Sequence, residues 1–140
     1  MKSKETLVRL HRFQVDEKRR QMADIEAMIA DFRRMEQDLE HQITTEQERS
    51  GITDVTHFAY PTFAKAAMER RKNLLRSIEE LEQQMSDAKE EFSEAYSELK
   101  KYELMQEKEV DRRRSEISAI EQRELDEVAL DGHRRGTLTS

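Results

Sequence analysis

Apolar residues recur along this chain at alternating steps of three and four positions, in two long stretches. The first series is Met22, Ile25, Ile29, Phe32, Leu39 and Ile43, with Glu36 in its single gap. The second series is Leu74, Ile78, Leu81, Met85, Ala88, Phe92, Ala95, Leu99 and Tyr102. This spacing is that of the a and d positions of a heptad, through which helices pair in coiled coils. The pattern therefore predicts two long helices, each with one apolar stripe, which we call the seam.

The helix-breaking residues separate these two stretches. Gly51 and Pro61 bracket a short gap, and the only other breakers, Gly132 and Gly136, lie near the carboxyl end. Gly51 is suited to the left-handed conformation that closes a helix, and Pro61 to the first turn of the next one. We therefore expect an all-α fold, an antiparallel two-helix coiled-coil hairpin with a longer second helix. A parallel homodimer of unbroken helices is the competing architecture, and the gap argues against it.

The predicted arms are unequal in length. A fold-back centred near residue 55 pairs the amino terminus with a point near residue 106, and beyond Tyr102 the seam positions become polar. The second helix therefore overhangs the first. The predicted domain is a helical hairpin over residues 1–130, made of a helix at about 3–49, a bend at 50–60 and a helix at about 61–128. Residues 131–140 hold two glycines and no periodicity, and are predicted to be a disordered tail.

The composition excludes several classes of protein. Charged residues make up 40% and hydrophobic residues 35% of the 140 residues, and the mean hydropathy is -1.01, which leaves too little apolar material for a broad globular core. There is no cysteine, no Gly-rich phosphate loop and no apolar run near the roughly 20 residues of a membrane span. The four histidines are widely spaced. We expect no enzyme activity, no cofactor and no metal, and a cytoplasmic location.

Short basic clusters raise the question of nucleic-acid binding. They are 18–20, 33–34, 70–72 and 112–114, but acidic residues are interleaved and the net charge is -6. A solvated coiled-coil face explains them better than RNA binding, although a helical-hairpin RNA-binding module stays an alternative. The amino-terminal end and the start of the second arm are basic, whereas residues 79–109 are acidic. The basic ends are suited to acidic protein partners.

The bend is richer in apolar side chains than a turn between helices requires. Its members are Ile52, Val55, His57, Phe58, Tyr60 and Phe63. The aromatic rings can plug the open end of the hairpin, or they can form a surface on which a partner docks. The residue types alone leave both interpretations open.

Two stretches of the sequence resemble a known family. They are the start, Met-Lys-Ser-Lys-Glu-Thr-Leu-Val-Arg-Leu followed by Phe13 to Arg20, and the bend segment His57-Phe-Ala-Tyr-Pro-Thr-Phe-Ala-Lys-Ala-Ala67. Both are similar to the alphaproteobacterial form of the flagellar export protein family FliJ, and the resemblance extends to about Leu130. Heptads alone would mean little, because coiled coils resemble one another in composition. The bend motif is more specific, because periodicity does not require it.

The resemblance implies a non-enzymatic coiled-coil component of the flagellar type III export apparatus, needed for flagellum assembly and motility and so for chemotaxis. Such proteins engage the export ATPase ring, contact the cytoplasmic domain of the membrane export gate and assist export chaperones. They are cytoplasmic, and reach the inner face of the plasma membrane only through protein partners. The implied partners include no nucleic acid.

Ten residues are the candidate partner-binding positions in this chain. On the gate-facing side they are Phe58, Tyr60, Phe63 and Ala67, and on the ATPase side they are Arg12, Arg19, Arg20, Arg112, Arg113 and Arg114. A stalk protein of a nonflagellar type III secretion system and a chaperone-like clamp are alternative functions.

Overall fold

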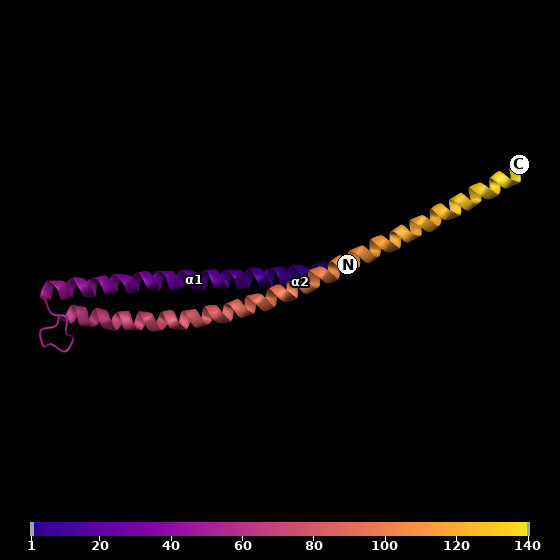
Figure 1. Cartoon of the computed structure of the whole chain (residues 1–140). Coiled ribbons are helices and arrows are strands. Elements are labelled where there is room, and N and C mark those ends of the chain that lie inside the picture. Colours follow the sequence, from indigo (N-terminus) through magenta and orange to yellow (C-terminus); the bar gives the residue numbers. More distant parts are fainter. Residues whose placement is uncertain (1, 140) are drawn as a thin grey trace. The chain divides into compact units, whose positions relative to one another are not determined.

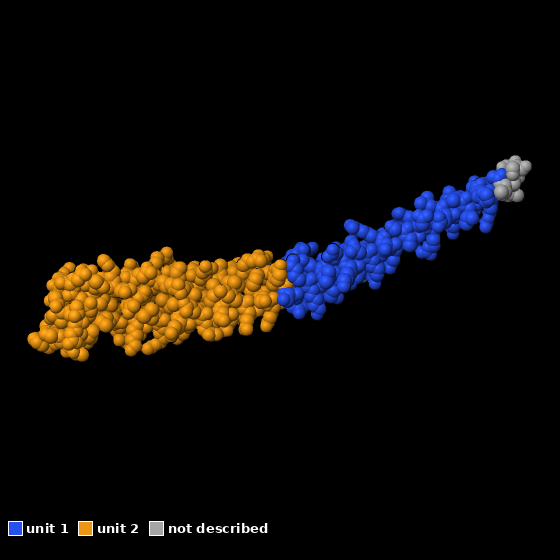
Figure 2. All heavy atoms as spheres, viewed as in Figure 1, with its two compact units in different colours: residues 1–12, 97–140 blue, residues 13–96 orange. Residues whose placement is uncertain are grey.

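The chain folds as two long antiparallel helices joined by one bend (Figure 1). The computed structural model describes residues 2–139, with side chains described for 3–136. Helix α1 runs over Lys2–Ser50 and helix α2 over Thr62–Thr139, and the described residues contain no strand. This confirms the predicted all-α hairpin with a longer second helix. The structure divides into two compact units, residues 13–96 and residues 1–12 with 97–140 (Figure 2).

The unit of residues 13–96 holds most of α1, the bend and the first half of α2. The heptad spacing of the seam continues back to Val8 in α1 and to Tyr60 in α2. The most buried apolar side chains of this unit lie on that spacing: Val15, Tyr60, Ala64, Ala67, Ile78, Leu81 and Ala88. No large side chain among the described residues is completely buried. Two paired helices shield a residue from two sides only, so one seam supplies the whole core.

Polar residues at seam positions find partners on the opposite helix. Glu36 interrupts the stripe of α1, and Arg71 interrupts that of α2. Arg71 Nε donates a hydrogen bond to Glu36 Oε1 at 2.7 Å, so the two interruptions face each other. Lys18, another polar member of the α1 seam, donates to Glu91 at 2.9 Å. Each polar group therefore keeps a charged partner when it leaves water.

The other unit joins the first turns of α1 to the second half of α2. Val8 and Leu99 are buried, and the His11 ring stacks on Tyr102 with centroids 4.4 Å apart. The outermost contact between the helices is an ion pair from Lys4 to the buried carboxylate of Glu109. From residue 110 to 136 every described side chain is exposed. We call residues 110–136 the overhang.

Helix α2 extends further than the sequence predicts. It continues across Gly132 and Gly136 to Thr139, whereas the sequence predicts a disordered tail from residue 131; the last residue of that tail, Ser140, lies outside the described residues. A glycine inside a helix costs about 1 kcal/mol relative to alanine but keeps its N–H donor. The intervening residues can therefore carry the helix across it. Over residues 2–139, none of the helices has the length and apolar character that crossing a membrane demands.

Candidate partner-binding surfaces

The bend begins where Gly51 reverses the chain. Gly51 has a φ of 72°, and its N–H donates to the carbonyl of Gln47 at 2.9 Å. This left-handed closure is the one predicted from the sequence, and it satisfies a carbonyl of the last helical turn. At the other side, Lys65 N–H donates to the carbonyl of Pro61 at 3.1 Å, so helical hydrogen bonding starts at Pro61.

Hydrogen bonds within the bend fix its backbone. Asp54 Oδ1 accepts from both the N–H and the hydroxyl of Thr56, at 3.0 and 2.7 Å. These bonds hold the pKa of the Asp54 carboxyl below its ordinary value, because they favour the charged form. Next, the N–H of Ala59 donates to Nδ1 of His57 at 3.0 Å, and the N–H of Tyr60 donates to the His57 carbonyl at 3.1 Å. The exposed side chains of the bend are thus carried on a defined backbone.

Tyr60 closes the end of the hairpin. Only 7% of it is exposed, and its hydroxyl accepts from Gln47 Nε2 at 2.9 Å and donates to Met68 Sδ at 3.4 Å. Ala67 is buried in the same seam. Both were predicted as parts of a docking surface, but their side chains are turned into the helix pair. They support the bend from within, because a heptad spacing of seven residues puts them on the inner face.

Phe58 and Phe63 are the aromatic side chains that the bend exposes. Phe58 is 96% exposed, and its ring stacks on that of His57, with centroids 4.8 Å apart and an interplanar angle of 21°. Phe63, in the first turn of α2, is 56% exposed. We call these two residues the bend surface. A ring held out in water on an ordered backbone is available for a partner without any rearrangement.

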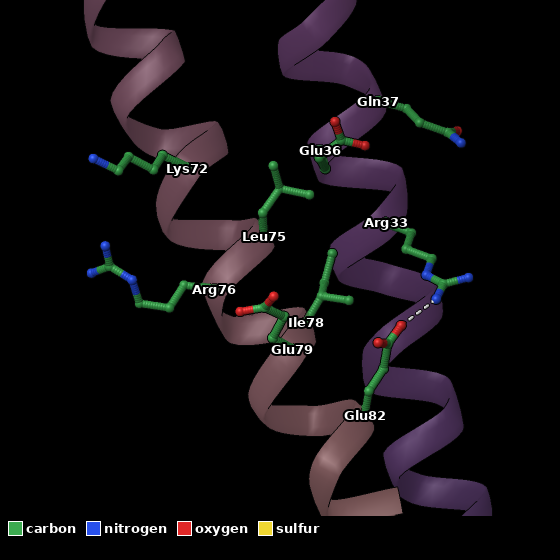
Figure 3. A pocket seen from close by; sticks show the side chains of 9 residues that line it. All are labelled: Arg33, Glu36, Gln37, Lys72, Leu75, Arg76, Ile78, Glu79 and Glu82. Carbon is green, nitrogen blue, oxygen red and sulfur yellow. Dashed lines mark hydrogen bonds and ion pairs between the residues drawn. The ribbon is translucent and has the colours of Figure 1, made fainter.

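Two grooves lie along the flanks of the helix pair, and one of them reaches the bend. One, of about 420 Å³, has Val55, Met68 and Leu75 as its apolar lining and Lys65 and Lys72 among its charged lining. Another, of about 600 Å³, has Leu75 and Ile78 between the helices, with an ion pair from Arg33 to Glu82 at 2.6 Å (Figure 3). Sequence reasoning missed these grooves. The available signal was an apolar residue directly beside a seam position, such as Leu75 after Leu74.

The six candidate arginines divide between the two units. Arg19 and Arg20 belong to the unit of residues 13–96, where the Arg19 guanidinium lies 5.5 Å from the centre of the Phe92 ring. Arg12 belongs to the other unit and forms an ion pair with Glu103 at 3.6 Å. The overhang contributes the remaining three, Arg112, Arg113 and Arg114, all exposed. Four of the six candidate arginines thus belong to one unit and two to the other.

The base of the overhang is an electrostatic cluster. Glu109 accepts a hydrogen bond from Lys4 and also pairs with Arg112 at 3.3 Å. The Lys4 bond lowers the pKa of the Glu109 carboxyl, burial opposes this, and the positive charges of Lys4, Arg112 and Arg113 add to the lowering. The cluster marks where the paired section ends.

Comparison with known proteins supports the resemblance seen in the bend. Neither the curated proteins nor the solved structures contain a match to this chain. A family model described as "Flagellar FliJ protein" matches residues 4–137, which is nearly the whole chain. The match includes nearly all of both helices, the bend surface and the whole overhang. The chain therefore belongs to the FliJ family, whose members are components of the flagellar export apparatus.

Proposed function

We propose that this protein couples the flagellar export ATPase ring to the cytoplasmic domain of the membrane export gate and assists export chaperones. It acts in the cytoplasm, without catalysis, and reaches the membrane only through protein partners. Family membership supports the export apparatus as its setting. The observation that carries the proposal is Phe58, a 96% exposed ring on a hydrogen-bonded bend. Each of the two units presents a distinct exposed surface, as a coupling protein requires.

The bend surface is the proposed contact with the gate. Burying a phenylalanine side chain contributes about 2 kcal/mol through the hydrophobic effect. Phe58 gains none of this within its own chain, whereas Tyr60 fills the end of the hairpin. Closure of the hairpin therefore does not explain Phe58, and recruitment of an apolar partner does. The groove that includes Val55 of the bend, with Lys65, Arg71 and Lys72 in its lining, extends the area that such a partner can cover.

The overhang and the start of α1 are the proposed contact with the ATPase ring. Arg12, Arg112, Arg113 and Arg114 lie in the same unit, and all four are exposed. Arginine forms paired hydrogen bonds with carboxylates, so such a cluster favours acidic protein surfaces. Arg19 and Arg20 extend this proposal to the neighbouring part of α1.

Coupling is proposed to work through binding free energy. A protein that binds one conformation of the ring more tightly than another shifts the ring toward that conformation, by no more than the difference in affinity. A second contact with the gate links this shift to the export channel. The chain needs no chemistry of its own for this role.

The test replaces Phe58 and Phe63 together by alanine in the living bacterium. We expect loss of swimming motility and of flagellar export, with the protein expressed and helical as before, because neither ring is buried. Phe13→Ala is the matched control, since Phe13 on α1 is 57% exposed and lies far along the sequence from the bend. Normal motility in the double variant, or an equal loss in the Phe13 control, would refute a docking role for the bend surface.

A further inference from the structure

One face of the overhang carries an apolar stripe that no described side chain of the protein covers. At about 100° of rotation per residue, Val110, Ile117, Leu125 and Val128 fall within one narrow sector of α2. Their exposed fractions run from 42% to 68%. Two polar residues, Arg114 and Glu121, complete the same stripe. The apolar area is larger than a solvated helix needs.

This stripe is not an extension of the seam that pairs α2 with α1. Continuing the heptad spacing beyond Glu109 gives Arg113, Glu116, Ile120, Arg123 and Glu127, of which only Ile120 is apolar. Among the described residues, α1 does not reach it, because Lys4 near the start of α1 already pairs with Glu109. The stripe is therefore exposed in the part of the chain that the structure describes.

The charged side chains that flank the stripe differ in sign between its two halves. The first half is flanked by Arg113 and Arg114, and the second half by Glu121 and Glu124. Two pairs of positions along the stripe are symmetric about the level of Ala119. Val110 and Val128 lie equally far from it on either side, and so do Arg114 and Glu124, which carry opposite charges. Such a helix is complementary to itself when a second copy runs in the opposite direction.

We propose that two copies of this chain pair antiparallel through residues 110–128 of α2, about a two-fold axis near Ala119. Val110 then lies opposite Val128 of the second copy, and Arg114 lies opposite Glu124, a residue of opposite charge. Every such contact occurs twice, as two-fold symmetry requires. A parallel pair would instead bring the two arginine clusters together, and like charges side by side are unfavourable.

The length of the paired segment sets the strength of this association. Residues 110–128 span about 28 Å of helix, and pairing them buries on the order of 1,000 Å², near the lower limit for a specific interface. We therefore expect a reversible dimer with a dissociation constant on the order of 100 µM. The dimer would cover Arg113 and Arg114. It would therefore block other proteins from the overhang until a tighter-binding partner displaces the second copy. It stands independently of the proposed coupling function.

Sedimentation velocity of the full chain over a concentration series tests the pairing. We expect a monomer at low concentration and a dimer as the concentration rises past the dissociation constant. R113E/R114E and E121R/E124R should each remain monomeric, because each gives an overhang of one dominant charge, and an equimolar mixture of the two should again dimerise. Asp126→Arg is the control, because it reverses a charge on the opposite face of α2 and should leave the dimer intact. A wild-type chain that stays monomeric throughout, or a mixture that fails to associate while both variants remain helical, would overturn the proposal.

Disulfide trapping tests the direction of pairing. The chain has no cysteine, so introduced thiols are the only ones present. A mixture of Val110→Cys and Val128→Cys chains should form a cross-linked heterodimer under mild oxidation, and so should a mixture of Ile117→Cys and Glu121→Cys chains. Ala119→Cys should not cross-link, because at about 100° per residue Ala119 lies on the face of α2 opposite the stripe. Cross-linking of Val110→Cys to itself in preference to Val128→Cys would show parallel pairing and refute the antiparallel arrangement.

Discussion

The charged pair inside the seam gives a prediction whose sign depends on which partner is removed. Glu36 and Arg71 are joined at 2.7 Å, but their side chains are 13% and 38% exposed. Arg71→Leu strands a carboxylate that has little access to water. Glu36→Leu strands a guanidinium on a long stem that already reaches solvent. The two single substitutions should therefore differ in their effects.

The structure sets the size of each effect. A buried charged group that loses its partner costs about 3 kcal/mol, and a leucine placed in the seam returns about 1 to 2 kcal/mol by burial. Arg71→Leu should thus lower the free energy of unfolding by about 1 to 2 kcal/mol, and Glu36→Leu should leave it nearly unchanged. The double variant should be more stable than the original by about 1 to 3 kcal/mol, since replacing both partners removes the desolvation cost as well.

Urea denaturation followed by far-UV circular dichroism measures all four proteins of this cycle. The differences in free energy of unfolding between the original protein and each of the three variants give the coupling free energy of the pair. Neither single variant gives this quantity alone. If Arg71→Leu proves no more costly than Glu36→Leu, the unequal exposure of the two side chains does not govern the energetics. If the double variant is the least stable of the four, the pair stabilises the hairpin outright, and the reasoning is wrong.

Three further predictions concern Gly51, Gly132 and the base of the overhang. Gly51→Ala should destabilise the hairpin by about 1 kcal/mol, because an added Cβ meets no neighbour but the positive φ strains any L side chain. Gly132→Ala also meets no neighbour and lies inside α2, so it should raise the helical circular dichroism signal; a loss of signal would contradict this. For Glu109, the lowered pKa means that its bond to Lys4 stabilises the start of α1 above the ordinary glutamate pKa and is lost as the pH falls through the lowered value. Amide chemical shifts near Val8 should report that transition by NMR, and Lys4→Gln should abolish it; a transition that persists in Lys4→Gln would assign it to another group.

The seam was predictable from the sequence, whereas the role of each bend residue was not. Heptad spacing identifies Val8, Val15 and Ile78 as inward positions, and each of them is buried. The same spacing cannot say whether Phe58 or Tyr60 plugs the hairpin, because the bend has no period. The turns of the backbone determine which ring is buried. They place Tyr60 against Gln47 inside the helix pair and leave Phe58 exposed to solvent. The flank grooves depend on side chains from both helices, which no single stretch of sequence contains.

The sequence by itself determined the two helices, the glycine that separates them and the unequal length of the arms. These features follow from local propensity and periodicity, which act between neighbours along the chain. The tertiary structure alone decided which polar interruptions meet. In the sequence, Glu36 and Arg71 are two separate polar interruptions of the apolar stripes. Only the register between the helices brings them together as one ion pair. Register is a property of the pair, because it depends on distances between residues far apart in sequence.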